Sequence, residues 1–180
     1  MNLSTAASFE AADSESTIEE QLNRLLTENG PALLRLASSY TNTSSDRDDL
    51  FQDIAIALWK GLPRFRGECS ERTFLFRVAH NRAIDFLRRH RAPTSPIDAE
   101  SPIRDARPNP ETGLAQEQQG ERLRRAIHRL PLPYRQVITL TLEEMSYSEI
   151  AAILGVTETN VGVRLNRARQ LLRQLLEKSK

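Results

Sequence analysis

The chain is poor in the residues that build disulfide-rich, metal-binding or membrane-spanning proteins. It has one cysteine in 180 residues, so no internal disulfide can form. Cys69 and the three histidines do not stand at spacings typical of metal ligands, and we expect neither a metal nor a cofactor. The N-terminus has no positive start and no long apolar run follows, which argues against a signal peptide and against membrane insertion. We therefore expect a protein of the reducing cytoplasm.

Signatures of strands and of catalysis are also missing. Apolar and polar residues nowhere alternate in the manner of a half-buried strand, so the predicted fold class is all-α. The sequence shows no paired catalytic carboxylates, no glycine loop for phosphates and no metal cluster. An enzyme acting on nucleic acid is therefore poorly supported.

The net charge is small, but the charged residues are strongly segregated along the chain. The net charge is +1, yet residues 1–59 carry −7 and residues 60–92 carry +6. Residues 93–120 then carry −3 and residues 121–180 carry +5. Two basic blocks indicate two surfaces for a polyanion, with the acidic blocks left for another partner. The simpler explanation, that helical proteins are rich in charge everywhere, does not account for so regular a pattern.

The clearest motif begins at Ser146, where two helices joined by a tight turn are predicted. Ser146 and Glu149 match a capping box, and Gly155 ends the first helix. Thr157 can cap a second, longer helix, whose apolar positions recur every three or four residues at Val161, Leu165, Ala168, Leu172 and Leu175. This order is typical of the helix-turn-helix, in which the second helix enters the major groove of DNA. The alternative is an ordinary helical hairpin whose arginines face water.

The N-terminal half is predicted to hold a tail and four helices. Residues 1–16 are small and polar, which favours a flexible tail. Thr17 resembles the start of a helix that Asn29-Gly30 closes, and Pro31 suits the first turn of the next helix. A third helix is predicted from Asp46 to Leu62 and a fourth from about Ser70.

Prolines then interrupt the helical periodicity and divide the chain. Residues 92–117 are acidic and rich in proline, which predicts an extended linker. At roughly 3.3 Å per residue this linker can span about 85 Å. Two small helical domains are therefore expected, residues 17–91 and residues 118–180, the second ending in the helix-turn-helix.

Two helices of the first domain carry candidate binding surfaces. The third predicted helix has a stripe for burial, Leu50, Ile54, Ala57 and Leu58, and opposite it an acidic and partly apolar surface. Trp59 can belong to the core or to a partner, and the core is the commoner place. The fourth helix gathers arginines and an amide beside aromatic rings, the side chains that hold phosphates and stack on unpaired bases. Alternatively Phe74, Phe76 and Phe86 lie in the core.

The order of these parts resembles the extracytoplasmic-function group of bacterial sigma factors. DLFQDIAIALWKGLPRFRG is similar to that family's segment for core binding and promoter melting, and RTFLFRVAHNRAIDFLRR to its promoter-reading helix. LPLPYRQVITLTLEEMSYSEIAAILGVTETNVGVRLNRARQLLRQLL is similar to its C-terminal domain. The resemblance implies a subunit that binds core RNA polymerase, recognises minus-ten and minus-thirty-five promoter elements as melted and double-stranded DNA, and is inhibited by an anti-sigma factor.

The resemblance also assigns residues to each surface. Core polymerase would be bound by Asp49, Gln52, Asp53, Ile56 and Lys60. The minus-ten element would be held by Phe65, Arg66, Arg72, Phe74, Arg77, His80, Asn81 and Arg88. The minus-thirty-five element would be read by Thr157, Thr159, Asn160, Val163, Arg164, Asn166 and Arg167.

Two features depart from the family pattern. Gly162 and Val163 stand where a basic and a small polar residue are common, and Phe74 stands where tryptophan is frequent. Base contact would then rest more on Arg164, Asn166 and Arg167, and Val163 could touch a thymine methyl group. The competing hypothesis is a helix-turn-helix regulator with a separate helical sensor domain, acting without polymerase docking.

Overall fold

The computed structural model describes the backbone of residues 3–90 and 114–177, and side chains over 17–90 and 119–177. Every regular element in these ranges is helical, in agreement with the predicted all-α class. The first part holds α1 (Leu3–Ser38), α2 (Ser44–Gly61), the short 3₁₀ turn η1 (Leu62–Arg64) and α3 (Glu71–His90). The second holds α4 (Leu114–His128), α5 (Leu132–Leu142), α6 (Tyr147–Leu154) and α7 (Glu158–Glu177). No helix in the described ranges has the length and apolar character that crossing a membrane requires.

The helix α1 is longer than the sequence indicated. It runs without interruption through Thr17 and Pro31, so the helix start predicted at Thr17 and the break predicted at Gly30 were wrong, and residues 3–16 of the predicted tail are helical. Residues 3–28 contain no proline or glycine and several alanines, which favour a helix. A proline inside a helix costs about 3 kcal/mol. Burial offsets that cost, because α1 buries Leu25 before the proline and Leu33 and Leu36 after it.

The boundaries of α2 follow its cap. Thr43 is the N-cap, and its hydroxyl oxygen accepts a hydrogen bond from the amide of Asp46 at 3.1 Å. The helix therefore begins two residues before the predicted start at Asp46. Three of the four residues in its predicted stripe, Leu50, Ile54 and Leu58, are fully buried against α1 and α3, whereas Ala57 is only half-buried.

The first helices of the second part begin earlier than the sequence predicted. The linker predicted over residues 92–117 lies largely outside the described residues, but α4 already begins at Leu114, four residues before the predicted domain boundary. Pro131 is the N-cap of α5, and Pro133 occupies its first turn. Backbone N–H groups in the first turn have no acceptor within the helix, so a proline there costs no hydrogen bond. The prolines therefore start α5 rather than delay it to Tyr134.

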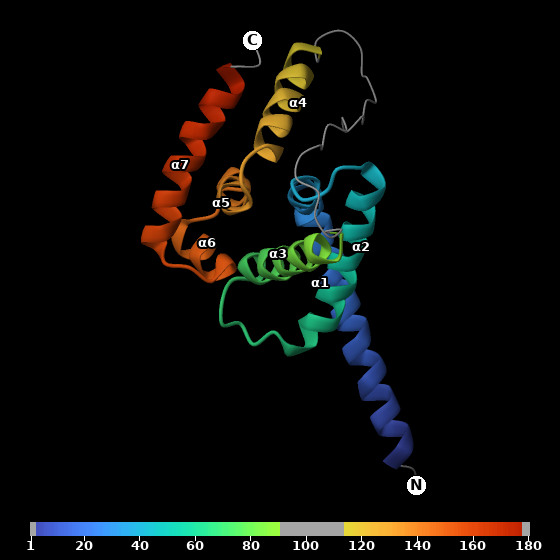
Figure 1. Ribbon diagram of the computed structural model, residues 1–180. Coiled ribbons are helices and arrows are strands. Elements are labelled where there is room, and N and C mark those ends of the chain that lie inside the picture. The colour runs from blue at the N-terminus through green and yellow to red at the C-terminus, as the bar shows by residue number, and fades with distance from the viewer. Residues whose placement is uncertain (1–2, 91–113, 178–180) are drawn as a thin grey trace.

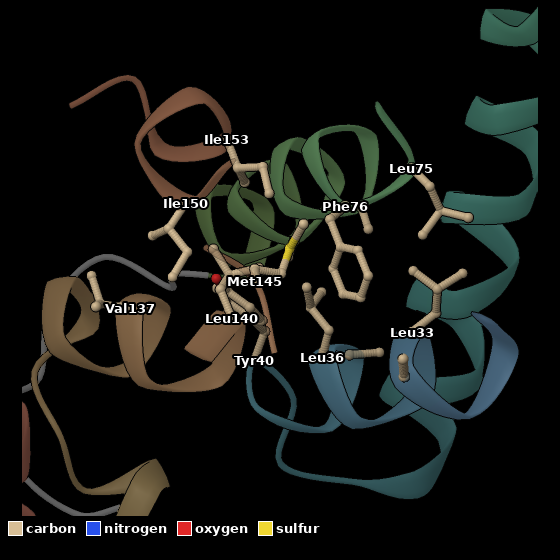
Figure 2. Packing of buried hydrophobic residues seen from close by; sticks show 14 of the residues in the cluster. Leu33, Leu36, Tyr40, Leu75, Phe76, Val137, Leu140, Met145, Ile150 and Ile153 are labelled. Carbon is tan, nitrogen blue, oxygen red and sulfur yellow. The ribbon is translucent and has the colours of Figure 1, made fainter. Parts of the chain in front are cut away.

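The two parts are packed on each other rather than held apart. In Figure 1 the N-terminal end of α3 points at α6, and α5 and α6 lie between α3 and α7. The turn between α5 and α6 enters the junction. Figure 2 shows Met145 of this turn beside Phe76 of α3 and Leu36 of α1, and Met145 is 4% exposed. Buried apolar residues form one cluster that runs through both parts.

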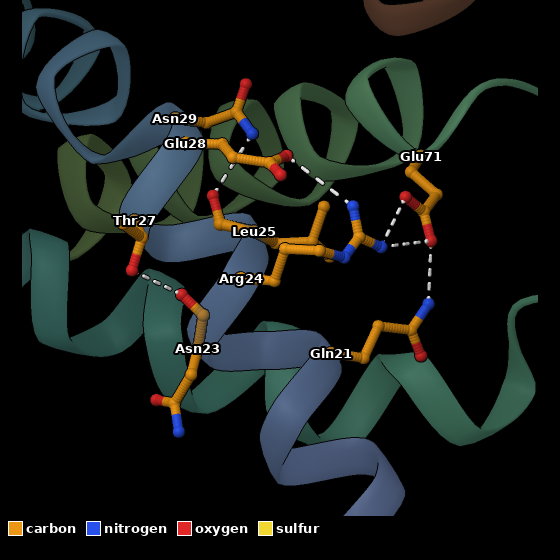
Figure 3. A network of polar contacts seen from close by, with 8 residues as sticks. All are labelled: Gln21, Asn23, Arg24, Leu25, Thr27, Glu28, Asn29 and Glu71. Carbon is orange, nitrogen blue, oxygen red and sulfur yellow. Dashed lines mark hydrogen bonds and ion pairs between the residues drawn. The ribbon is translucent and has the colours of Figure 1, made fainter.

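A polar network joins α1 to the start of α3 inside the first part. Arg24 donates two hydrogen bonds to the carboxylate of Glu71, at 3.0 and 2.8 Å, and Gln21 donates a third at 2.7 Å (Figure 3). The guanidinium of Arg24 holds the pKa of Glu71 below its ordinary value. Because Arg24 is half exposed, this pair contributes little to the stability of the fold and mainly orients the two helices.

Candidate nucleic-acid and protein interfaces

The helix-turn-helix is built as its local sequence predicts. The hydroxyl of Ser146 accepts from the amide of Glu149 at 3.3 Å, and the Glu149 carboxylate accepts from the amide of Ser146 at 2.8 Å, which completes the capping box. The hydrogen bond from the Ser146 amide is the main cause that lowers the pKa of Glu149. Gly155 ends α6 in the left-handed conformation at φ 65°, and the Thr157 hydroxyl caps α7 by accepting from the amide of Asn160 at 3.2 Å.

The first half of α7 presents a polar surface outward. Val161, Leu165 and Ala168 are buried, at no more than 1% exposure, and they hold the helix on α5 and α6. The side chains on the other side form the reader surface, which is exposed except for the half-buried Arg164: Thr157, Thr159, Asn160, Val163, Arg164, Asn166 and Arg167. Six of the seven predicted residues thus lie on α7 and the seventh, Thr157, caps it, and together they present amide, hydroxyl and guanidinium groups able to meet base edges.

Gly162 lies at the side of the reader surface. A Cβ atom added there would meet the ring of Tyr147 at 3.6 Å, an ordinary contact distance. Tyr147 begins α6 and is 44% exposed. Gly162 therefore borders an aromatic ring, a neighbour that the sequence analysis did not identify.

A second candidate surface combines the loop after η1 with α3. The rings of Phe65 and Phe74 lie 4.7 Å apart between centroids at 32°, and both are half-buried. Phe74 also reaches Gly61, where an added Cβ would meet its ring at 3.2 Å. Arg66, Asn81 and Arg88 are exposed. The two rings offer a stacking platform beside cationic groups, a combination suited to unpaired bases.

The other members predicted for this surface have partners within the protein. Arg72 donates to the backbone carbonyl of Glu143 at 2.6 Å, and its guanidinium lies 5.6 Å from the ring centre of Phe76. Arg77 lies 3.9 Å from the sulfur of Cys69. Of the aromatic residues for which the sequence left two possibilities, Phe76 and Phe86 are in the core.

His80 is placed differently from the prediction. Its ring is 7% exposed and forms a hydrogen bond between Nδ1 and the hydroxyl of Tyr40 at 3.1 Å. Burial lowers the pKa of His80 to about 4, so the ring is neutral at pH 7. A buried neutral ring cannot meet a phosphate or a base in this arrangement. The resemblance assigned His80 to the minus-ten surface, but its ring lies against Tyr40, which follows α1, and is buried there.

A third candidate surface lies on α2 and is acidic and apolar together. Asp49, Gln52, Ile56 and Lys60 are exposed, and Asp53 is half-buried with an ion pair to Arg89 at 2.7 Å. Trp59 belongs with them, because 46% of it is exposed, and the preference for the core was wrong. We call these six residues the α2 surface. Large exposed apolar side chains beside charges are typical of protein interfaces.

The described residues were also compared with the arrangement that a metal site requires. Over residues 3–90 and 114–177, no group of three His, Cys, Asp or Glu side chains is arranged to hold a metal ion.

Known proteins resemble the chain in the same two parts. The family model described as Sigma-70 region 2 matches residues 25–92, and the one described as Sigma-70, region 4 matches residues 120–172. The first match contains the α2 surface and α3, and the second contains the helix-turn-helix. A helix-turn-helix regulator with an unrelated sensor domain leaves the first match unexplained.

Curated relatives and a solved structure extend the similarity to the whole chain. The ECF RNA polymerase sigma factor SigM of Mycobacterium tuberculosis is 35% identical over 146 residues, 80% of this chain and 71% of SigM. The RNA polymerase sigma factor CnrH of Cupriavidus metallidurans is 31% identical over 186 residues, 98% of this chain and 97% of CnrH. A structure described as "CnrH in complex with the cytosolic domain of CnrY" superposes with a TM-score of 0.69 and 29% identity, covering 94% of this chain and 96% of that one.

Proposed function

The chain belongs to the extracytoplasmic-function family of RNA polymerase sigma factors, and from this premise we propose which surface meets core polymerase and which surfaces meet the promoter. A sigma factor is an initiation factor of transcription, which gives core polymerase its choice of promoter. The main support for the proposal is that surfaces of different character lie on different helices. The surface of α2 is acidic and apolar, whereas those of α3 and α7 are basic.

The α2 surface is proposed as the docking site for core polymerase. Ile56 is 51% exposed and Trp59 46%, and apolar groups of this size gain most from burial in an interface. Asp49 and Gln52 beside them are exposed and available for polar contacts. An interface with an apolar centre and a charged rim has this composition.

The pair Phe65 and Phe74 is proposed to hold the melted minus-ten element. Stacking of a base on an aromatic ring contributes about 1 to 3 kcal/mol, which can offset the cost of a few kcal/mol for extruding a base. Arg66, Asn81 and Arg88 are exposed on the loop and along α3, and we assign them to contacts with phosphates and bases of the same element. We leave His80 out of this surface because its ring is buried.

The reader surface of α7 is proposed to enter the major groove of the minus-thirty-five element. The helix presents Asn166 and Arg167 on its exposed side, and an arginine can donate to both O6 and N7 of guanine. Val163 is 49% exposed and suits contact with a thymine methyl group. CnrH was solved with the cytosolic domain of CnrY, and by analogy we infer a protein partner and a cytoplasmic location. As the family implies, we take that partner to be an anti-sigma factor.

The test is reconstitution with purified core polymerase and a library of promoter fragments. We expect a stable complex and selection of particular start sites, and Asp49→Arg should weaken polymerase binding at least tenfold without changing the melting temperature. Glu177→Arg, an equal charge reversal at the exposed end of α7, is the matched control and should bind as the parent does. If the parent forms no complex, or if both variants lose binding equally, the assignment of the α2 surface is wrong.

A further inference from the structure

The reader surface has an apolar corner where the start of α6 approaches α7. Tyr147, the first residue of α6, is 44% exposed, and a Cβ atom added at Gly162 of α7 would meet Cε2 of its ring at 3.6 Å. Val163 follows Gly162 and is 49% exposed. We call Tyr147, Gly162 and Val163 the apolar corner. Large apolar side chains left exposed in a binding surface indicate that the partner covers them.

Gly162 keeps this corner open. It lies inside α7 with a helical backbone and no positive φ, so the conformation of the chain does not require a glycine there. Glycine also weakens a helix relative to alanine. Among the described residues beyond its own stretch of helix, the Tyr147 ring is the one neighbour within 4 Å of an added Cβ. The absent side chain therefore leaves the ring of Tyr147 accessible from the reader surface.

Polar residues border the corner along α7. Thr159 lies three residues before Gly162 and Asn166 four residues after it, so both stand one helical turn away on the same side. Both side chains are exposed. An asparagine amide can bond N6 and N7 of adenine, and a threonine hydroxyl can bond several base edges. These polar groups hold the helix against base edges, and the corner between them faces the same edges without a charge.

The chemistry of the corner selects an apolar group of the DNA. A lysine or arginine at position 162 would contact a phosphate, which strengthens binding to every sequence alike. Gly162 and Val163 have no hydrogen-bonding side chain, and Tyr147 turns ring carbon toward Gly162. The major groove presents one apolar group among the four bases, the 5-methyl group of thymine. The corner is therefore complementary to thymine and to no other base.

We propose that the apolar corner is a specificity site for one thymine methyl group of the minus-thirty-five element, which contacts Val163, the Cα atom of Gly162 and the ring of Tyr147. This inference rests on the proposed function and deepens it, because it names the base that this part of the reader surface prefers. Tyr147 is then a specificity-determining residue that lies outside the recognition helix. Burial of one methyl group changes an affinity by about fourfold.

The experiment replaces each thymine of the minus-thirty-five element by uracil, one at a time, in the promoter that the reconstitution selects. Uracil lacks the methyl group but keeps the hydrogen-bonding groups of thymine. The two fragments, carrying different labels, compete for the same holoenzyme, and the ratio in which they are bound is the uracil penalty. With the parent protein, one thymine should show a penalty of about fourfold.

Two variants on different helices should lose the penalty at that same thymine. Tyr147→Ala removes the ring and Val163→Ser removes the apolar groups of valine, and each should lower the penalty below about twofold. Tyr147→Phe keeps the ring and should retain the full penalty, which separates the ring from the hydroxyl that can bond a phosphate. Thermal melting shows whether each variant is folded, as we expect at exposed positions.

A matched control removes an exposed apolar side chain elsewhere in the second part. Leu142 ends α5, outside the helix-turn-helix, and is 54% exposed. Leu142→Ala should leave the uracil penalty as it is in the parent. A loss of the penalty in this variant would overturn the assignment to the corner, because it would show a general effect of truncating apolar side chains.

The remaining outcomes separate this inference from the proposed function. A promoter without a penalty at any thymine, or a full penalty in folded Tyr147→Ala, would overturn the inference. A penalty that Tyr147→Phe also loses would overturn it as well, because the hydroxyl rather than the ring would then carry the effect. If no holoenzyme selects a promoter, the proposed function fails and the specificity site with it, whereas a selective holoenzyme without the penalty refutes the specificity site alone.

Discussion

His80 should make the free energy of unfolding depend on pH, because its ring is buried and hydrogen-bonded to Tyr40. Burial lowers the pKa of His80 from 6.5 to about 4. Above pH 6.5 the ring is neutral in both the folded and the unfolded state, so the contribution is constant. As the pH falls from 6.5 to 4, the unfolded chain takes up a proton that the folded protein excludes, and stability is lost.

The size of the loss follows from the shift in pKa. Each pKa unit corresponds to 1.36 kcal/mol, so a shift to about 4 predicts a loss of about 3 kcal/mol across this window. That is a large part of the 5 to 15 kcal/mol typical of a small protein. Below pH 4 the contribution levels off.

The perturbation is His80→Gln, which keeps a polar partner for Tyr40 but does not titrate. Urea unfolding followed by circular dichroism at several pH values from 7.5 to 4 should show that the variant loses about 3 kcal/mol less than the parent. Burial also lowers the pKa of His128, and the carboxylates titrate in this range, but both contribute equally to the two proteins. Parallel losses would refute a buried neutral His80. A variant as stable as the parent but weakened in minus-ten binding would instead return His80 to the DNA surface.

Two further predictions concern the helix-turn-helix. Gly155→Ala should lower the free energy of unfolding by about 1 to 2 kcal/mol, because Gly155 is in the left-handed conformation at φ 65°. Gly162→Ala should raise it by up to about 1 kcal/mol, because alanine favours a helix and the added methyl group meets Tyr147 at an ordinary 3.6 Å. Thermal melting of the two matched variants measures both effects, and equal effects would contradict the turn geometry. Arg167→Ala should relax discrimination at one position of the minus-thirty-five element by about 1 to 3 kcal/mol if the arginine contacts guanine. An equal loss on every sequence, measured by titration with holoenzyme, would show a phosphate contact instead.

The helix-turn-helix could be read from the sequence because its signals are local. A serine with a glutamate three residues on, a glycine after the last helical turn and a threonine before the next helix act within a few residues. Backbone hydrogen bonds at helix ends need such nearby partners, so their sequence signature survives without knowledge of the rest of the fold. The burial of Val161, Leu165 and Ala168 followed from the 3.6-residue period alone, whereas Leu172 and Leu175 of the same predicted stripe are half-buried.

Tertiary packing decided what local signals could not. Pro31 is typical of the first turn of a helix, but the burial of apolar side chains before and after it keeps α1 continuous. A tryptophan is usually found in the core, and His80 was predicted on the DNA-binding surface, yet Trp59 is 46% exposed and His80 is buried. Their places depend on which neighbouring helix covers them. The pairing of Arg35 with Glu143, 108 residues apart, has no periodic or capping signature, because only the packing of the second part on the first brings them together.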